Sequence, residues 1–243
     1  SLANLTAATG GNLEDARALI NKAVKENPSE IGPRLELIEF YLARQDAKKA
    51  AAIAQDALAA IPDKAELLNA AGVAQFLSGD VNQALATYAK LATLQPASPL
   101  AYLRIAEIQS AQKNTDEAVK NLRKALEIRP NLLEAQQKLI LVYLAAGNSK
   151  DALAVARNVE KQRPSEAVGY VLEGDIQASQ KRWPEAASAY RSGLKQAPST
   201  ELAIRLNKTL LASQNATEAD KTANDWIKAH PKDVAFRLYL GEA

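Results

Sequence analysis

Residues 65–98 read AELLNAAGVAQFLSGDVNQALATYAKLATLQPAS, and their pattern of helix breakers and helix formers predicts the fold. It contains Ala84 and, twelve residues later, Pro96. Proline lacks a backbone N–H and clashes with the preceding helical turn, so Pro96 predicts the end of a helix. The polar segment 78–80 (SGD) predicts a tight turn between two runs of helix-forming residues. The stretch therefore predicts a helix, a turn, a second helix and a stop.

The same pattern recurs along the whole chain. Prolines recur with a period of 34, and with a last interval of 33, at Pro28, Pro62, Pro96, Pro130, Pro164, Pro198 and Pro231. An alanine stands twelve residues before each of them, at Ala16, Ala50, Ala84, Ala118, Ala152, Ala186 and Ala219. A small residue at a fixed place in a helix indicates that two helix backbones approach closely there. The chain is therefore expected to be all-α and built from repeated helix pairs.

The repeat boundaries follow from the proline spacing. Complete repeats are expected at 31–64, 65–98, 99–132, 133–166, 167–200 and 201–233, with partial repeats at 1–30 and 234–243. The sixth repeat is one residue shorter than the others, because a residue is missing ahead of Ala219. We expect residues 1–243 to form a single superhelical array. Because the chain starts and stops inside a repeat, it is expected to be a fragment of a longer array.

The period, the Ala-to-Pro interval and the glycine-containing first helices, as at 71–72 (AG), 173–174 (EG) and 240–241 (LG), resemble the tetratricopeptide repeat family. Tyr88 and Tyr190 also fall where that family favours aromatic residues in second helices. The resemblance covers the whole chain. It implies a right-handed α-solenoid whose first helices line a concave groove for a peptide or protein.

The resemblance also implies groove-facing side chains at the second, fifth, ninth and twelfth residues of each repeat. The ninth residue is acidic in alternate repeats, at Glu39, Glu107 and Asp175, so these acids lie two repeats apart. Carboxylates at such intervals favour a ligand with Lys or Arg at matching intervals, although ordinary solvated helix residues are the alternative. The predicted groove residues are Leu35, Glu39, Leu42, Asn69, Val73, Phe76, Leu103, Glu107, Gln137, Leu141, Leu144, Val171, Asp175, Arg205 and Thr209.

Composition excludes most catalytic chemistry. The chain has no Cys and one His, so it offers no thiolate nucleophile and no imidazole pair for zinc. Neighbouring acids such as Glu36 and Glu39 should stay solvated and ionised on a helix surface. With 30 Lys+Arg against 28 Asp+Glu, the formal net charge of +2 gives no strong field for nucleic acid. We expect no catalytic residue, cofactor or metal, and a non-enzymatic protein-binding scaffold.

A narrower resemblance rests on four C-terminal segments, 169–175 (GYVLEGD), 182–187 (RWPEAA), 198–202 (PSTEL) and 226–233 (WIKAHPKD). They are similar to the tetratricopeptide lipoproteins encoded with bacterial exosortase (PEP-CTERM) and exopolysaccharide systems. This resemblance implies a Gram-negative cell-envelope protein on the periplasmic side. Its lipid anchor would be an N-terminal Cys outside this chain, and its role would be polysaccharide export or protein sorting.

Other interpretations stay open. The array could instead be a regulatory or substrate-recruiting arm of an enzyme whose catalytic domain lies elsewhere, and its location could be cytoplasmic. Apolar helix faces at the two ends could also stack between copies, which would give end-to-end self-association. We expect no direct insertion of this chain into a membrane, because it has no apolar run long enough to span one.

Overall fold

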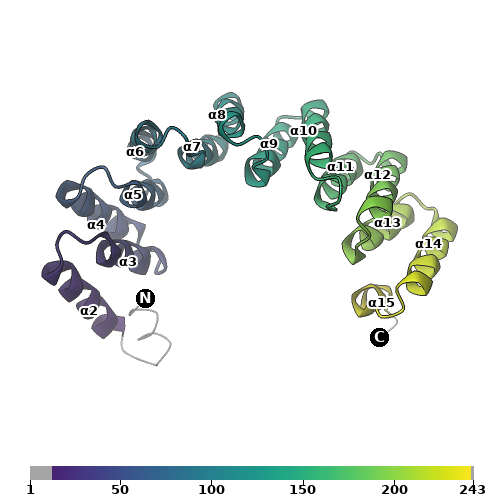
Figure 1. The fold of residues 1–243 in the computed structure, drawn as a ribbon, viewed down its shortest axis with the longest axis horizontal. Helices are drawn as coiled ribbons and strands as arrows, with labels where there is room; N and C mark the ends of the chain where they lie inside the picture. Colours follow the sequence, from purple (N-terminus) through teal and green to yellow (C-terminus); the bar gives the residue numbers. More distant parts are fainter. Residues whose placement is uncertain (1–12, 242–243) are drawn as a thin grey trace. The chain divides into compact units, whose positions relative to one another are not determined.

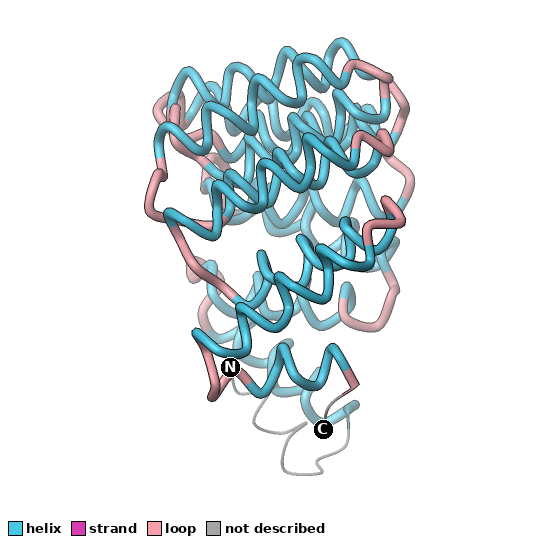
Figure 2. Tube along the Cα trace, turned by 90° about the vertical axis from the view of Figure 1, so that its right-hand side faces the viewer, coloured by secondary structure: helices cyan, strands magenta, loops and turns pink. Residues whose placement is uncertain are grey.

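The computed structural model describes residues 13–241, and this part of the chain contains helices, turns and loops but no strand (Figures 1 and 2). The all-α prediction is confirmed. The helices are α2 (Leu13–Glu26), α3 (Ile31–Leu42), α4 (Ala47–Ala60), α5 (Ala65–Ser78), α6 (Val81–Leu94), α7 (Leu100–Ala111), α8 (Thr115–Ile128), α9 (Leu133–Ala145), α10 (Ser149–Gln162), α11 (Val168–Ser179), α12 (Trp183–Gln196), α13 (Thr200–Ala212), α14 (Ala216–Ala229) and α15 (Val234–Leu240).

Each predicted complete repeat corresponds to two helices with the expected break between them, and each partial repeat has one described helix. Odd-numbered helices from α3 to α15 are the first helices of their repeats, and even-numbered helices from α2 to α14 are the second helices. Of the predicted partial repeats, residues 1–12 and 242–243 lie outside the described residues. The chain divides into two compact units, residues 1–130 and 131–243, and each is described here by itself. The single array of residues 1–243 stays a prediction.

The turn between the two helices has the same backbone form in every complete repeat. One residue adopts a left-handed conformation, with φ between 59° and 96°, at Gln45, Gly79, Lys113, Gly147, Lys181 and Gln214. Only two of these six are glycine, the residue that adopts this conformation without steric cost. Packing of the helix pair therefore sets the turn even where the local sequence opposes it.

The recurring alanines lie where the helices cross. Ala16, Ala50, Ala84, Ala118, Ala152, Ala186 and Ala219 are all between 0 and 2% exposed. This burial confirms that the position needs a small side chain at a close helix contact.

At a second pair of buried positions, the larger residue lies on the first helix in some repeats and on the second helix in others. The eighth residue lies in the first helix and the twenty-fourth in the second helix. These pairs are Ile38 with Ala54, Gly72 with Tyr88, Ala106 with Leu122, Ile140 with Ala156 and Gly174 with Tyr190. A small residue on one helix always accompanies a larger one on the other, so the space between the helices stays filled.

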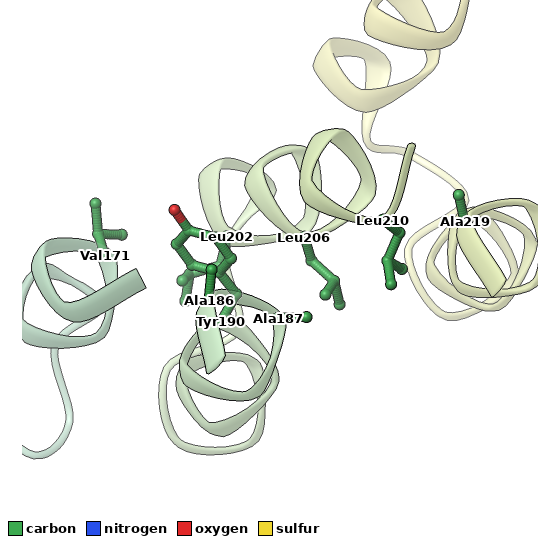
Figure 3. Packing of buried hydrophobic residues seen from close by; sticks show 8 residues of the cluster. All are labelled: Val171, Ala186, Ala187, Tyr190, Leu202, Leu206, Leu210 and Ala219. Carbon is green, nitrogen blue, oxygen red and sulfur yellow. The ribbon is translucent and has the colours of Figure 1, made fainter. Parts of the chain in front are cut away.

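The glycines show how close this contact is. A Cβ built on Gly174 would lie 2.1 Å from a ring carbon of Tyr190, and one on Gly72 would lie 2.4 Å from a ring carbon of Tyr88. Both tyrosine rings thus occupy the space that a side chain would need. Figure 3 shows Tyr190 in the core of the second unit, where α12 packs against Leu202 and Leu206 of α13.

Candidate functional site

The two Gly–Tyr pairs bring phenol hydroxyls of second helices to the first helices. The Tyr88 hydroxyl donates to the main-chain oxygen of Asn69 at 3.3 Å, and the Tyr190 hydroxyl donates to Asp175 Oδ1 at 2.6 Å. Burial raises the pKa of Tyr88 to about 12. Burial also raises the pKa of Tyr190, and its hydrogen bond to Asp175 adds to the effect. Both phenols therefore stay neutral and act as hydrogen-bond donors.

An arginine from the next first helix lies beside each tyrosine. In the second unit, Arg205 of α13 donates from Nη1 to both carboxylate oxygens of Asp175, at 2.6 and 2.8 Å. Arg205 also contacts Glu201 at 2.9 Å. In the first unit, Arg104 of α7 contacts Glu107 at 2.9 Å, and both influence the ionisation of Tyr88. Two of the three predicted acidic positions are therefore already paired with an arginine of the chain itself.

Pairing of Asp175 gives a stability prediction. Asp175→Asn should lower the free energy of unfolding of the second unit by about 1 kcal/mol, since the ion pair with Arg205 is partly exposed to solvent. Urea unfolding followed by tryptophan fluorescence reports on this unit, because both tryptophans, Trp183 and Trp226, lie in it. Asp225→Asn, at an exposed aspartate on α14, is the control and should change little; an equal loss in both variants would contradict the prediction.

The sixth repeat corrects part of the predicted groove. Helix α13 begins two residues after Pro198, whereas the first helices of the other repeats begin three or four residues after their proline. The missing residue therefore lies in the loop before α13. Every residue of α13 takes the repeat position one place later than the sequence predicted for it. Thr209 is only 5% exposed because it takes the place of a buried core residue. The fifth and ninth positions belong to Ile204 and Lys208 instead of Arg205 and Thr209.

The remaining groove predictions differ in accessibility. Leu103 and Val171 are buried, at 5 and 8% exposure, and cannot contact a ligand without rearrangement. Exposed positions are Glu39, Gln137 and Leu141. Half-buried positions are Leu35, Leu42, Asn69, Val73, Phe76, Glu107, Leu144, Asp175 and Arg205. The residues up to Glu107 lie in the first unit and the others in the second, so the structure assembles them as two surfaces described separately.

The term first-helix face is used here for the solvent-exposed surface of the first helices. These are α3, α5 and α7 in the first unit and α9, α11, α13 and α15 in the second. The sequence analysis missed Arg104 on this face, and it missed that the buried Tyr88 and Tyr190 of second helices donate hydrogen bonds to first helices. The signal was present, since a glycine is followed sixteen residues later by a tyrosine in two repeats, at 72 and 88 and at 174 and 190. Each pair is also followed by an arginine early in the next first helix.

An apolar hollow of about 490 Å³ lies at the loops around Pro198 and Pro231 in the second unit. Trp226 stacks on His230 with ring centroids 3.8 Å apart, and its Nε1 donates to Asp233 Oδ2 at 2.8 Å. Burial opposes ionisation of Asp233, but hydrogen bonds from Trp226, from Thr200 and from the backbone N–H of Phe236 hold its pKa below the usual value. These polar atoms are engaged with one another, so the cluster supports the loop.

Within residues 13–241, no group of His, Asp and Glu is arranged to hold a metal ion. Among the described helices, none is long and apolar enough to cross a membrane.

Comparison with known families decides the relationship. Two tetratricopeptide repeat models match, one at residues 5–65, 35–99 and 138–200 and the other at 100–132. The chain belongs to the tetratricopeptide repeat family. A search of curated protein sequences found no match.

Solved tetratricopeptide structures resemble the chain in fold. A tetratricopeptide repeat protein from Parabacteroides merdae is 16% identical over 99% of this chain and 95% of its own, with a TM-score of 0.58. YrrB, described as a TPR protein with an unusual peptide-binding site, is 18% identical over 78% of this chain and 97% of its own, with a TM-score of 0.51.

A longer relative is one chain in the crystal structure of the APC/C hetero-tetramer Cut9–Hcn1. It is 16% identical over 93% of this chain, with a TM-score of 0.55, and the chain spans 45% of the length of that relative. At these identities the likeness shows the tetratricopeptide fold alone, which is typical of protein-interaction scaffolds.

Proposed function

We propose that this tetratricopeptide chain is a non-catalytic scaffold that binds a peptide or protein partner on its first-helix face. The supporting observation is the placement of exposed large apolar side chains. Seven occur among the described residues, and five of them, Leu77, Leu141, Leu211, Val234 and Leu238, lie on first helices. Exposed apolar side chains concentrated on one set of elements indicate a partner that covers them. The peptide-binding site of YrrB, a structural neighbour, is consistent with this role.

The charge expected on the partner depends on which carboxylates of this chain are not already paired with an arginine. Glu107 and Asp175 contact Arg104 and Arg205, whereas Glu39 is exposed and forms no ion pair among the described residues. A paired carboxylate attracts a ligand cation less, because its charge is already compensated. We therefore propose one basic contact at Glu39 and an apolar contact at Leu77, both in the first unit.

A leucine variant tests the face directly. A partner is first recovered by cross-linking in the native cell, and its affinity is then measured by calorimetry. Leu77→Asp should weaken binding at least about tenfold, since it places a charge in an apolar contact. Leu94→Asp is the matched control, because Leu94 is 43% exposed on the second helix α6. Equal effects of the two variants would contradict binding on the first-helix face.

A charge variant tests the basic contact. Glu39→Lys should weaken binding of the same partner about tenfold at low salt and less at high salt. Glu107→Gln should weaken it less, because Glu107 is already paired with Arg104. Unchanged affinity with Glu39→Lys would show that Glu39 is an ordinary solvated residue.

For the biological setting, we propose a bacterial cell-envelope system for exopolysaccharide export or PEP-CTERM protein sorting, on the periplasmic side. Support comes from the four C-terminal segments that resemble lipoproteins of such systems. Fractionation of the native cells with an antibody against this chain tests the location. Recovery in the cytosolic fraction would contradict the proposal.

A further inference from the structure

Helix α13 of the second unit presents groove side chains that the repeat spacing does not predict. Because the loop before α13 is one residue shorter than in the other repeats, the fifth, ninth and twelfth repeat positions belong to Ile204, Lys208 and Leu211. Lys208 is exposed, Leu211 is 49% exposed and Ile204 is half-buried. These residues are three or four positions apart, so they share one face of the helix. The groove positions of α13 therefore hold one cation between two aliphatic side chains.

The Lys208 ammonium is held in place but forms no ion pair among residues 13–241. Its Nζ lies 5.4 Å from the centroid of the Tyr239 ring of α15, within the range of a cation–π contact. The Tyr239 hydroxyl donates to Asn207 Oδ1 at 2.8 Å, and Asn207 Nδ2 donates to the main-chain oxygen of Ala219 at 2.9 Å. These bonds fix the ring beside α13. The ring orients the ammonium without compensating its charge.

The carboxylates on the first helices of the second unit, by contrast, are already engaged. Four occur on the described parts of α9, α11, α13 and α15, and each contacts a basic side chain. The pairs are Glu134 with Lys138 at 3.7 Å, Glu173 with Arg157 at 2.8 Å, Asp175 with Arg205 at 2.6 Å and Glu201 with Arg205 at 2.9 Å. A ligand cation therefore meets carboxylates that already have a basic contact, whereas a ligand carboxylate meets an ammonium without a counter-ion.

This charge and its aliphatic neighbours define the kind of partner. We propose that α13 binds an internal segment of a protein partner in which a glutamate or aspartate side chain lies between aliphatic side chains. The carboxylate meets Lys208, and the aliphatic groups cover Ile204 and Leu211. The inference rests on the proposed function, because it takes the first-helix face as the surface that binds a protein. It assigns to the second unit a partner charge opposite to the one proposed at Glu39.

The experiment uses the full chain labelled with ¹⁵N and follows its backbone amides during titration at low salt. The probes are three short peptides of the pattern Leu-Ser-X-Ser-Leu with both ends blocked, in which X is Glu, Gln or Lys. Side chains on one face of an extended peptide repeat about every 7 Å. Successive groove side chains of α13 are about 5–6 Å apart along the helix, so the probe can place X at Lys208 and its leucines at Ile204 and Leu211.

We expect the Glu probe to shift the amides of these three residues with a dissociation constant on the order of millimolar. It should bind about three- to fivefold more tightly than the Gln probe, since one exposed charge contact contributes modestly, and the Lys probe should bind more weakly than either. Lys208→Glu should reverse this order, and Leu211→Ser should weaken all three probes. Lys195→Glu makes the same charge change at an exposed residue of α12 and is the control, so it should keep the order of the wild type.

The proposal is overturned if no probe shifts the α13 amides, or if the order of the probes is unchanged in Lys208→Glu. It is also overturned if the Gln probe with a free C-terminus binds more tightly than the blocked Glu probe, because a terminal carboxylate would then be the preferred ligand. Shifts that appear with rising protein concentration alone would show that a second copy covers α13, which overturns it as well.

The leucine variant described above separates this inference from the proposed function. If the probes fail while Leu77→Asp still weakens the recovered partner, only the acidic contact on α13 is wrong. If Leu77→Asp also has no effect on that partner, binding on the first-helix face is wrong.

Discussion

Replacing Gly174 by isoleucine is expected to lower the free energy of unfolding of the second unit by about 3 kcal/mol. Even a Cβ at this position would lie 2.1 Å from the ring of Tyr190, so the larger side chain has no space unless α11 and α12 separate. Urea unfolding followed by tryptophan fluorescence measures the loss, because both tryptophans lie in this unit.

A second substitution should restore much of that loss. Tyr190→Ala alone leaves a cavity and should cost about 3–5 kcal/mol. The double variant Gly174→Ile with Tyr190→Ala reproduces the residues found at these two positions in the fourth repeat, Ile140 and Ala156, both of which are buried. We expect it to be more stable than either single variant, with a coupling of several kcal/mol.

Additive losses in the double variant would refute this exchange of size between helices. Gly32→Ile provides the control for helix propensity, measured by circular dichroism. A Cβ at Gly32 meets nothing within 4 Å, so this variant should change stability little.

The second unit is expected to lose stability as the pH rises from about 5 to about 8, and Glu160 of α10 should cause this loss. Burial, together with a hydrogen bond to Glu173 of α11 and the negative charge of Glu173, raises the pKa of Glu160 to about 7. Arg157 acts in the opposite direction and contacts Glu173 at 2.8 Å. The α11 backbone packs against this site, since a Cβ on Gly169 would lie 2.6 Å from the backbone nitrogen of Glu160.

The sign follows from proton binding. The folded state holds the Glu160 proton more tightly than the unfolded state, so the stabilisation is complete below the ordinary pKa and disappears as pH rises through about 7. Because Glu160 is only partly buried, we expect about 1–2 kcal/mol between the two pH values rather than the full shift.

Glu160→Gln tests the assignment. Glutamine can donate to Glu173 at any pH, so the variant should be as stable at about pH 8 as at about pH 5 in tryptophan-monitored urea unfolding. Glu185→Gln, at an exposed residue of α12, is the control and should keep the pH dependence of the wild type. A pH dependence that survives in Glu160→Gln would assign the effect to other groups.

Most of the fold could be predicted because it depends on local features repeated many times. Each proline ends a helix through its own ring, and each alanine at a helix crossing is small in any context. Pro96 and Ala84 therefore predict a helix end and a close helix contact from the sequence alone. The left-handed turns at Lys113 and Lys181 were less predictable. Neither residue favours that conformation, and the packing of the two helices imposes it.

The candidate site was predicted less well, because it depends on which side chains meet across helices. The repeat spacing predicts Thr209 on the groove, but the loop before α13 is one residue shorter than in the other repeats, and Thr209 therefore lies in the core. Asp175 lies in α11, and its pairing with Arg205 depends on a residue 30 positions away in the next repeat. The spacing of residues within one helix could not show that the charge of Asp175 is already compensated by Arg205.

The helix pairs, their period and the family follow from the sequence alone, because helix stops and close crossings depend on the covalent nature of proline and the small volume of alanine. Which carboxylates are paired with an arginine, and where Gly174 admits the Tyr190 ring, could be known only from the folded structure. Those features depend on distances between side chains of different helices, and these distances are set when packing fills the space between helices.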